Sequence, residues 1–229
     1  MRHRNKLAFV LLLALAVALT GFSAVSADDG AKQAISAETQ YARAGSTLLY
    51  VRAYYQSGGL KATGSGFLVS GDGLALTAAH VVDKAARVTV LGADGKELEC
   101  TVVSSDPASD VAVLRLPGGK YDFLALAGEA PEGGAVLRAM GYPIKDTLVI
   151  TEGLCASPEG TVSGKERMLV TCDIVNGMSG GPIINVYGEA VGLCSGSVRT
   201  MDGIHLSAIW NELSAAVTAA QAENKEAGQ

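Results

Sequence analysis

Short apolar stretches of β-strand character recur along the chain about every 8 to 15 residues. Turn signals such as SGDG, GADGK and PGGK separate them. Two groups of about six strands follow from this pattern, with a break near 128–134. The predicted strands are 47–55, 64–70, 74–79, 86–92, 97–105 and 111–116, and then 135–141, 148–154, 167–172, 181–186, 189–196 and 203–209.

Helical patterns are confined to the two ends of this strand-rich region. The alanine-rich stretch SAIWNELSAAVTAAQAENK predicts a C-terminal helix, and 32–44 is the one other candidate. The chain is therefore predicted to be all-β, with two packed six-stranded antiparallel barrels and a C-terminal helix. Closed barrels leave no exposed strand edges, and the crevice between two barrels is a natural place for a site.

The N-terminus has the features of a secretory signal. Arg2, Arg4 and Lys6 precede an apolar run at 7–19, and small residues follow up to Ala27. The alternative is an uncleaved membrane anchor, for which 13 apolar residues are short. We expect a signal peptide at 1–27 and export to the cell envelope, the periplasm or the medium.

The remaining chain is divided into four predicted parts. We expect an N-terminal segment at 28–45, a first barrel at 46–128, a second barrel at 129–210, and a C-terminal helix and tail at 211–229. Removing the three positive charges of the signal changes the net charge from −5 to −8. An acidic protein of this kind is a poor partner for nucleic acid or anionic lipid.

Four cysteines in an exported protein suggest disulfide bonds. Cys155 and Cys172 lie symmetrically about Ser163-Gly164, so a hairpin there would let them face each other. Three pairings of the four cysteines are possible, and this one remains open beside the others. No cysteine pair has the spacing of a metal site, and no metal is predicted. The disulfide candidates are Cys100, Cys155, Cys172 and Cys194.

The stretch NGMSGGPI places Ser179 among glycines, where it is either a nucleophile or a polar residue of a tight turn. A nucleophilic serine needs a base, and the base needs an orienting group. His80 ends a predicted strand, as a base aimed into a crevice would, although a lone histidine is more often a hydrogen-bonded core residue. Asp110 precedes another strand; its alternative role is a strand-end cap. Asp106, in Asp-Pro, is predicted to be a turn residue.

Glycines lie where acyl transfer would require them. Gly177 lets the backbone turn so that the N–H groups of Gly177 and Ser179 converge on a developing oxyanion. Gly180 and Gly181 leave room for a substrate and for an imidazole ring. A thiol enzyme is disfavoured, because no glycine-framed cysteine accompanies a base.

The chain resembles the trypsin-like serine proteases of the chymotrypsin fold, and most of all their bacterial HtrA/Deg branch. The similarity runs from about Thr47 to Leu213. It is carried by GSGFLVSGDGLALTAAHVVDKA, by VTVLGADGKELECTVVSSDPASDVAVLRL, by AMGYP with LVITEGLCAS, by NGMSGGPIINVYGEAVGL and by DGIHLSAIWNEL.

The resemblance implies hydrolysis of polypeptide substrates through an acyl-enzyme, without a cofactor. His80 would be the general base, Asp110 its orienting group and Ser179 the nucleophile, with the N–H groups of Gly177 and Ser179 as the oxyanion hole. Met178 departs from the family, which has an Asn or Asp before the serine. The PDZ domain of the HtrA branch is not expected, and the oligomeric state is not defined.

Substrate preference is suggested by two residues of the second strand group. Asp173 lies six residues before Ser179, an offset at which digestive trypsins select Arg or Lys; a loop hydrogen bond is the simpler explanation of this aspartate. Glutamate-specific relatives use a histidine in the pocket wall, and His205 could lie near that pocket. The alternative to an enzyme is a catalytically silent two-barrel module that binds peptides or proteins.

Overall fold

The structure is a computed structural model that describes residues 32–92, 94–198 and 200–227. The predicted signal peptide, 1–27, lies outside the described residues, and so does its alternative as an anchor. Within the described part, no helix combines the length and apolar character needed to cross a bilayer. One compact unit begins at Ala34 and includes both groups of strands.

The first six strands form a closed antiparallel barrel with the order β1-β2-β3-β6-β5-β4. It corresponds to the first predicted group and confirms it. The strands are β1 (Leu48–Tyr54), β2 (Leu60–Leu68), β3 (Leu74–Ala78), β4 (Arg87–Leu91), β5 (Glu97–Asp106) and β6 (Val111–Arg115).

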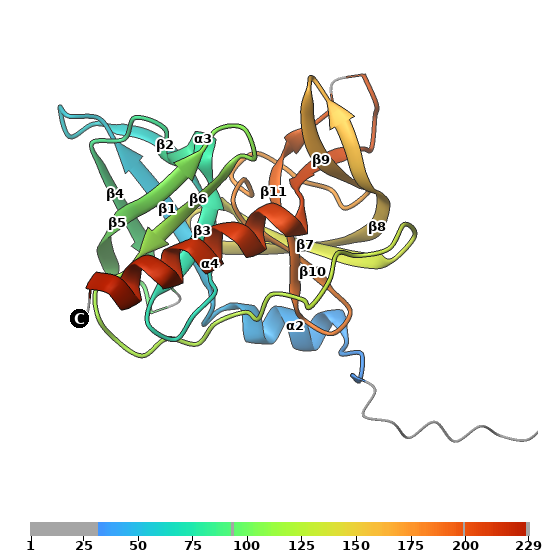
Figure 1. Ribbon diagram of the computed structural model, residues 1–229, viewed down its shortest axis with the longest axis horizontal. Helices are drawn as coiled ribbons and strands as arrows, with labels where there is room; N and C mark the ends of the chain where they lie inside the picture. Colours follow the sequence, from blue (N-terminus) through green and yellow to red (C-terminus); the bar gives the residue numbers. More distant parts are fainter. Residues whose placement is uncertain (1–31, 93, 199, 228–229) are drawn as a thin grey trace, which may run out of the picture. The chain divides into compact units, whose positions relative to one another are not determined.

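The other six strands close into a second barrel with the order β10-β11-β12-β9-β8-β7. Figure 1 shows the two barrels next to each other; the first six strands of the chain form one barrel and the last six form the other. The strands are β7 (Val136–Ile144), β8 (Thr147–Val162), β9 (Lys165–Val170), β10 (Pro182–Asn185), β11 (Ala190–Ser197) and β12 (His205–Ala208).

Both predicted helices form. α4 (Trp210–Ala227) contacts β5 and β6 of the first barrel and β11 of the second, and it ties the chain end to both. α2 (Ala37–Ala44) is preceded by its N-cap residue Ser36, whose side chain accepts a hydrogen bond from the Thr39 N–H. The expected helix at 32–44 therefore forms only over its second half.

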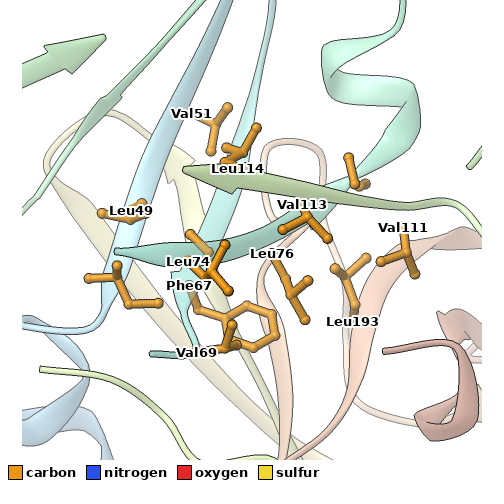
Figure 2. Packing of buried hydrophobic residues seen from close by; sticks show 14 of the residues in the cluster. Leu49, Val51, Phe67, Val69, Leu74, Leu76, Val111, Val113, Leu114 and Leu193 are labelled. Atoms are coloured by element: carbon orange, nitrogen blue, oxygen red, sulfur yellow. The ribbon is translucent and has the colours of Figure 1, made fainter. Parts of the chain in front are cut away.

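A single apolar cluster joins the two barrels. It is centred on Phe67, Leu74 and Leu76 of the first barrel, and it includes Leu193 of β11 in the second. Figure 2 shows Leu193 beside Val111 and Leu76. β3 is buried at all five positions because the second barrel covers its outer face. The barrels therefore pack as one body, which fixes the loops at their junction.

The disulfide expectation does not hold in the structure, where all four cysteines are buried free thiols. The hairpin turns at Ser163-Gly164 as expected, and Val162 pairs with Lys165. Two irregularities in β8 then shift the register, so that Cys155 lies opposite Val170. The Cys172 thiol instead donates a hydrogen bond to the Leu137 carbonyl at 3.3 Å. The symmetric spacing about Ser163-Gly164 therefore does not pair the two cysteines, because each bulge adds an unpaired residue to β8 and none to β9.

Candidate active site

His80 lies on α3 (Ala79–Val82), a single helical turn that follows β3 directly. Ala79, Val81 and Val82 are buried and anchor the turn, while the His80 side chain is 49% exposed. The Ala79 N–H donates to the Asp110 carbonyl at 3.1 Å. The pattern predicted a histidine at the end of a strand; the helical turn that presents it was not predicted.

Asp110 holds His80 in one orientation. The Nδ1 atom of the imidazole lies 3.0 Å from Oδ1 and 2.9 Å from Oδ2 of the carboxylate, and the His80 backbone N–H donates to Oδ1 at 3.0 Å. These contacts favour the tautomer with its proton on Nδ1, which leaves Nε2 free to accept a proton. Asp110 itself has a positive φ of 64°, at the start of β6.

The pKa of the Asp110 carboxyl results from two opposing influences. Burial raises this pKa, but the hydrogen bonds and the charge attraction from His80 together lower it by more. The pKa of Asp110 therefore lies below its ordinary value. Asp110 is therefore a carboxylate at neutral pH even though only 13% of its side chain is exposed.

Ser179 belongs to the loop 175–181, called the serine loop below. The Met178 N–H donates to the Val175 carbonyl at 3.0 Å, and Gly177 has a φ of +91°, as a type II turn requires at that position. Gly180 also has a positive φ, and its N–H donates to the Cys194 carbonyl at 2.8 Å. Gly177 thus turns the backbone as predicted. Gly180 and Gly181, which were expected to leave room for a substrate and an imidazole ring, instead lie against protein backbone: a Cβ atom on Gly180 would lie 2.2 Å from the Ser65 carbonyl oxygen, and one on Gly181 would lie 2.0 Å from the Met140 carbonyl oxygen.

Met178, which departs from the family's Asn or Asp, is fully buried in the apolar cluster of the second barrel. It anchors the serine loop by burial, where a polar residue would need a hydrogen-bond partner.

Two backbone N–H groups of the serine loop remain available. Within the described residues, neither the Gly177 N–H nor the Ser179 N–H donates to a protein acceptor. The Met178 side chain between them points into the core. Two such donors in one turn are what a site for a developing negative charge requires.

The structure brings the serine loop to α3. A Cβ atom placed on Gly64 would lie 2.7 Å from Cγ2 of Val81 and 2.8 Å from the Ser179 carbonyl oxygen. A Cβ on Gly180 would lie 2.7 Å from the Ala78 N atom. In the described part of the chain, the Ser179 hydroxyl makes no hydrogen bond. Nucleophile–base distances are often long in unliganded sites and shorten with substrate.

Ser195 of β11 lies at the same site and was not predicted from the sequence. Its buried hydroxyl lies beside the Asp110 carboxylate and contributes to lowering that pKa, although no hydrogen bond of standard geometry joins them. One serine in the run CSGS carries no signal of its own.

Asp173 and His205, the two residues named for substrate preference, lie near each other. The Nε2 atom of His205 lies 3.7 Å from Oδ1 of Asp173. The His205 side chain is 14% exposed and its Nδ1 has no partner in the described part, whereas the Asp173 side chain is 80% exposed. The Asp173 carbonyl accepts a hydrogen bond from Thr151. The loop hydrogen bond expected of Asp173 is thus made by its backbone carbonyl, while its carboxylate is exposed to solvent.

A cavity of about 460 Å³ opens beside His80 and Asp110. Lys165 and Arg167, at the β8–β9 hairpin, form its wall from the second barrel, and they donate to the carbonyls of Pro107 and Ala108. These bonds brace the segment that carries Asp110. No group of three His, Cys, Asp or Glu side chains in the described residues is arranged as a metal site.

The fold and these loops define a class of protein, and comparison with known proteins names it. Residues 64–193 match the family model described as trypsin-like peptidase domain, and the chain belongs to that family. The matched region begins at Gly64, beside the serine loop, and ends at Leu193 in the shared apolar cluster.

Relatives with curated descriptions come from the HtrA/Deg branch, as the sequence suggested. The chain is 36% identical to serine protease HTRA1 of Xenopus laevis over 143 residues, which are 58% of this chain and 31% of that protein. It is 34% identical over 136 residues to a probable periplasmic serine endoprotease DegP-like of Pseudomonas fluorescens, covering 58% of this chain and 29% of the relative. The chain thus spans about a third of these relatives' length.

Solved structures share the fold. A serine endoprotease from Yersinia pestis superposes with a TM-score of 0.70 at 24% identity, covering 82% of this chain and 68% of that one. The Rv3671c protease from M. tuberculosis, in its active form, gives a TM-score of 0.69 at 27% identity, covering 78% of this chain and 82% of that one. The prediction of a chymotrypsin-like fold is confirmed.

Proposed function

We propose that the protein is an exported serine endopeptidase that hydrolyses peptide bonds through an acyl-enzyme. The observation that carries this proposal is the pair of His80 and Asp110, with Nδ1 of His80 2.9 Å from the carboxylate and with His80 on a helical turn that lies next to a serine loop whose Gly177 and Ser179 N–H groups are available. Membership of the trypsin-like peptidase domain family supports the same chemistry.

In the proposed mechanism, the Ser179 hydroxyl attacks the scissile carbonyl while Nε2 of His80 takes its proton. Asp110 stays ionised and stabilises the imidazolium that forms. The N–H groups of Gly177 and Ser179 stabilise the oxyanion, the imidazolium returns the proton to the leaving amine, and the C–N bond breaks. Water then attacks the acyl-enzyme by the same steps, which releases the carboxylic acid and restores Ser179.

A catalytically silent module that binds peptides is the second candidate. The absence of a hydrogen bond to the Ser179 hydroxyl, among the residues that the structure describes, is what favours it. The ordered Asp110–His80 contacts argue for the enzyme, since a binding module has no need for a buried carboxylate on Nδ1.

Labelling with a fluorophosphonate probe decides between the two. We expect the purified parent protein to be labelled once, and Ser179→Ala and His80→Ala to lose labelling while they keep the parent's circular dichroism spectrum. Ser57→Ala, in an exposed turn of the first barrel, is the matched control and should label like the parent. A folded parent that is not labelled, or labelling that survives in Ser179→Ala, would overturn the assignment.

We further propose that Asp173 and His205 contact the substrate residue before the scissile bond. Asp173 would attract Arg or Lys, and the His205 imidazole would hydrogen-bond an acidic residue. Profiling with a peptide library separates the two, because Asp173→Asn should weaken cleavage after basic residues and His205→Gln cleavage after acidic ones. An unchanged profile in both variants would exclude the pair from specificity.

The proposed place of action is the periplasm or another part of the cell envelope. The N-terminal signal features and the relatives described as periplasmic support it. Fractionation of cells expressing the tagged chain, before and after deletion of residues 1–27, tests it; cytoplasmic protein in both cases would contradict it.

A further inference from the structure

One buried hydroxyl of the first barrel holds the serine loop of the second. Ser65, in β2, is fully buried, and its Oγ donates to the Gly177 carbonyl at 2.8 Å. The same Oγ accepts the Tyr142 N–H at 2.8 Å. The Ser65 backbone N–H donates to the Ser179 carbonyl, also at 2.8 Å. Ser65 therefore binds the backbone on both sides of Met178.

Ser65 is itself fixed from two sides. The Thr77 hydroxyl donates to the Ser65 carbonyl at 2.7 Å. A Cβ atom on Gly141 would lie only 2.8 Å from the Ser65 Oγ, so the glycine makes room for this hydroxyl. A side chain confined in this way can impose a position on its partner, because rotation of the hydroxyl would break its hydrogen bonds to both Gly177 and Tyr142.

The bond to Gly177 acts on the turn that aims the oxyanion donors. The peptide group between Gly177 and Met178 is held at its oxygen by Ser65 and at its N–H by the Val175 carbonyl. With that plane fixed, rotation of the Gly177 backbone is restricted. Glycine otherwise tolerates either sign of φ, so this turn needs an external restraint to keep its φ of +91°.

We propose that Ser65 is a positioning residue that holds the Gly177 N–H toward the oxyanion, an inference that rests on the proposed peptidase function. The hydroxyl touches no substrate. It acts through the Gly177 carbonyl, and its loss leaves a buried acceptor without its donor on the loop that must stay rigid.

Ser65→Ala should therefore lower kcat and leave KM nearly unchanged, because the oxyanion exists only in the transition state. Loss of an entire oxyanion donor costs about 100-fold to 1000-fold in kcat, and a misaligned donor should cost about 10-fold to 100-fold. The kcat of each variant is calculated per active site, and the sites are counted by fluorophosphonate titration. Unfolded protein then does not enter the comparison.

Ser207→Ala is the matched control. Ser207 is also fully buried, and its hydroxyl accepts the Leu193 N–H at 2.9 Å and donates to the Ala208 carbonyl at 2.8 Å. It thus bridges two backbone groups as Ser65 does, away from the Gly177 carbonyl. We expect it to lower the melting temperature like Ser65→Ala, with kcat per site within about twofold of the parent.

The outcomes separate this inference from the proposed function. A kcat per site in Ser65→Ala equal to the parent's, or equal losses in both variants, overturns the positioning role and leaves the peptidase intact. A parent without labelling and hydrolysis overturns the peptidase. The crystal structure of Ser65→Ala then decides the inference by itself: a changed Gly177 backbone supports it, and an unchanged φ near +91° overturns it.

Discussion

The carboxylate of Asp110 binds His80 twice, at the ring and at the backbone. Its Oδ1 lies 3.0 Å from both Nδ1 and the backbone N atom of His80, and its Oδ2 lies 2.9 Å from Nδ1. The backbone bond fixes where α3 begins, and the ring bonds fix how the imidazole turns. One side chain thereby links the local fold to the proposed chemistry.

Replacing Asp110 with Asn should reduce turnover far more than stability. The amide is nearly isosteric, but when its N–H₂ group faces Nδ1 it favours the wrong imidazole tautomer. We expect kcat to fall about 1000-fold to 10,000-fold at pH 7, in line with the effect of this substitution in serine proteases. Steady-state hydrolysis of a peptide substrate measures it, with Glu129→Gln, an exposed carboxylate, as the control for charge. A loss below tenfold would mean that Asp110 does not orient the base.

The same pair predicts a pH dependence of folding. The pKa of Asp110 is lower in the folded protein than the ordinary value of 3.8, so the unfolded chain binds this proton more readily. The stability that it contributes is fully present above the unfolded pKa and is lost as the pH falls through the folded pKa.

We expect the melting temperatures of the parent and Asp110→Asn to differ at pH 6 and to converge below about pH 4, as both are followed by circular dichroism. For Glu129→Gln, the difference in melting temperature from the parent should be small at both pH values. A gap between the parent and Asp110→Asn that is the same at pH 6 and pH 2.5 would refute the linkage.

Much of this architecture was predictable because its signals are local. Turn sequences and apolar runs placed all twelve strands, and Asp106 accepts the N–H groups of Ala108 and Ser109 as a turn residue should. The residues of the proposed triad were inferred from glycine spacing and strand ends, and they stay a prediction. Each of these signals depends on neighbours within a few residues.

What the sequence did not reveal depends on contacts between distant segments. α3 is one turn of AHVV, and it is held by Asp110, thirty residues away, and by burial of its apolar side chains. Ser65 and Ser195 are serines among small residues, and only the packing of the barrels gives Ser65 its partners and places Ser195 beside Asp110. The shifted register of β8 shows the same limit. Turns are marked by characteristic residues in the sequence, whereas the bulges of β8 are not.

The cysteines give a prediction that reverses the sequence-based expectation. Burial raises the pKa of the thiols, to about 12 for Cys100 and about 11 for Cys172, and it also raises the pKa of Cys155 and Cys194. Since the thiolate is the reacting species, the native protein should resist thiol reagents at pH 8.

Titration with a thiol reagent tests this directly. We expect no rapid reaction in buffer and four thiols per chain in denaturant without reductant. Reductant should leave the melting temperature unchanged. Two or no thiols in the denatured, unreduced protein would restore the disulfide interpretation.

Gly177 and Gly164 share a positive φ but differ in their surroundings. A Cβ atom on Gly177 would lie 2.5 Å from the Pro143 carbonyl oxygen, whereas nothing lies within 4 Å of one on Gly164. Both substitutions by alanine incur the backbone cost of a left-handed residue, about 1 to 2 kcal/mol. Gly177→Ala adds an overlap with backbone atoms that cannot rotate away, worth a further 1 to 3 kcal/mol or so.

Chemical denaturation of both variants should therefore show the larger loss of unfolding free energy in Gly177→Ala. That variant should also lose fluorophosphonate labelling at temperatures where it remains folded, because the shift of the turn moves the Gly177 N–H. Gly164→Ala, at the tip of the β8–β9 hairpin, should label like the parent. Equal destabilisation of the two would mean that Pro143 moves aside, and normal labelling of Gly177→Ala would mean that the turn does not set the oxyanion donors.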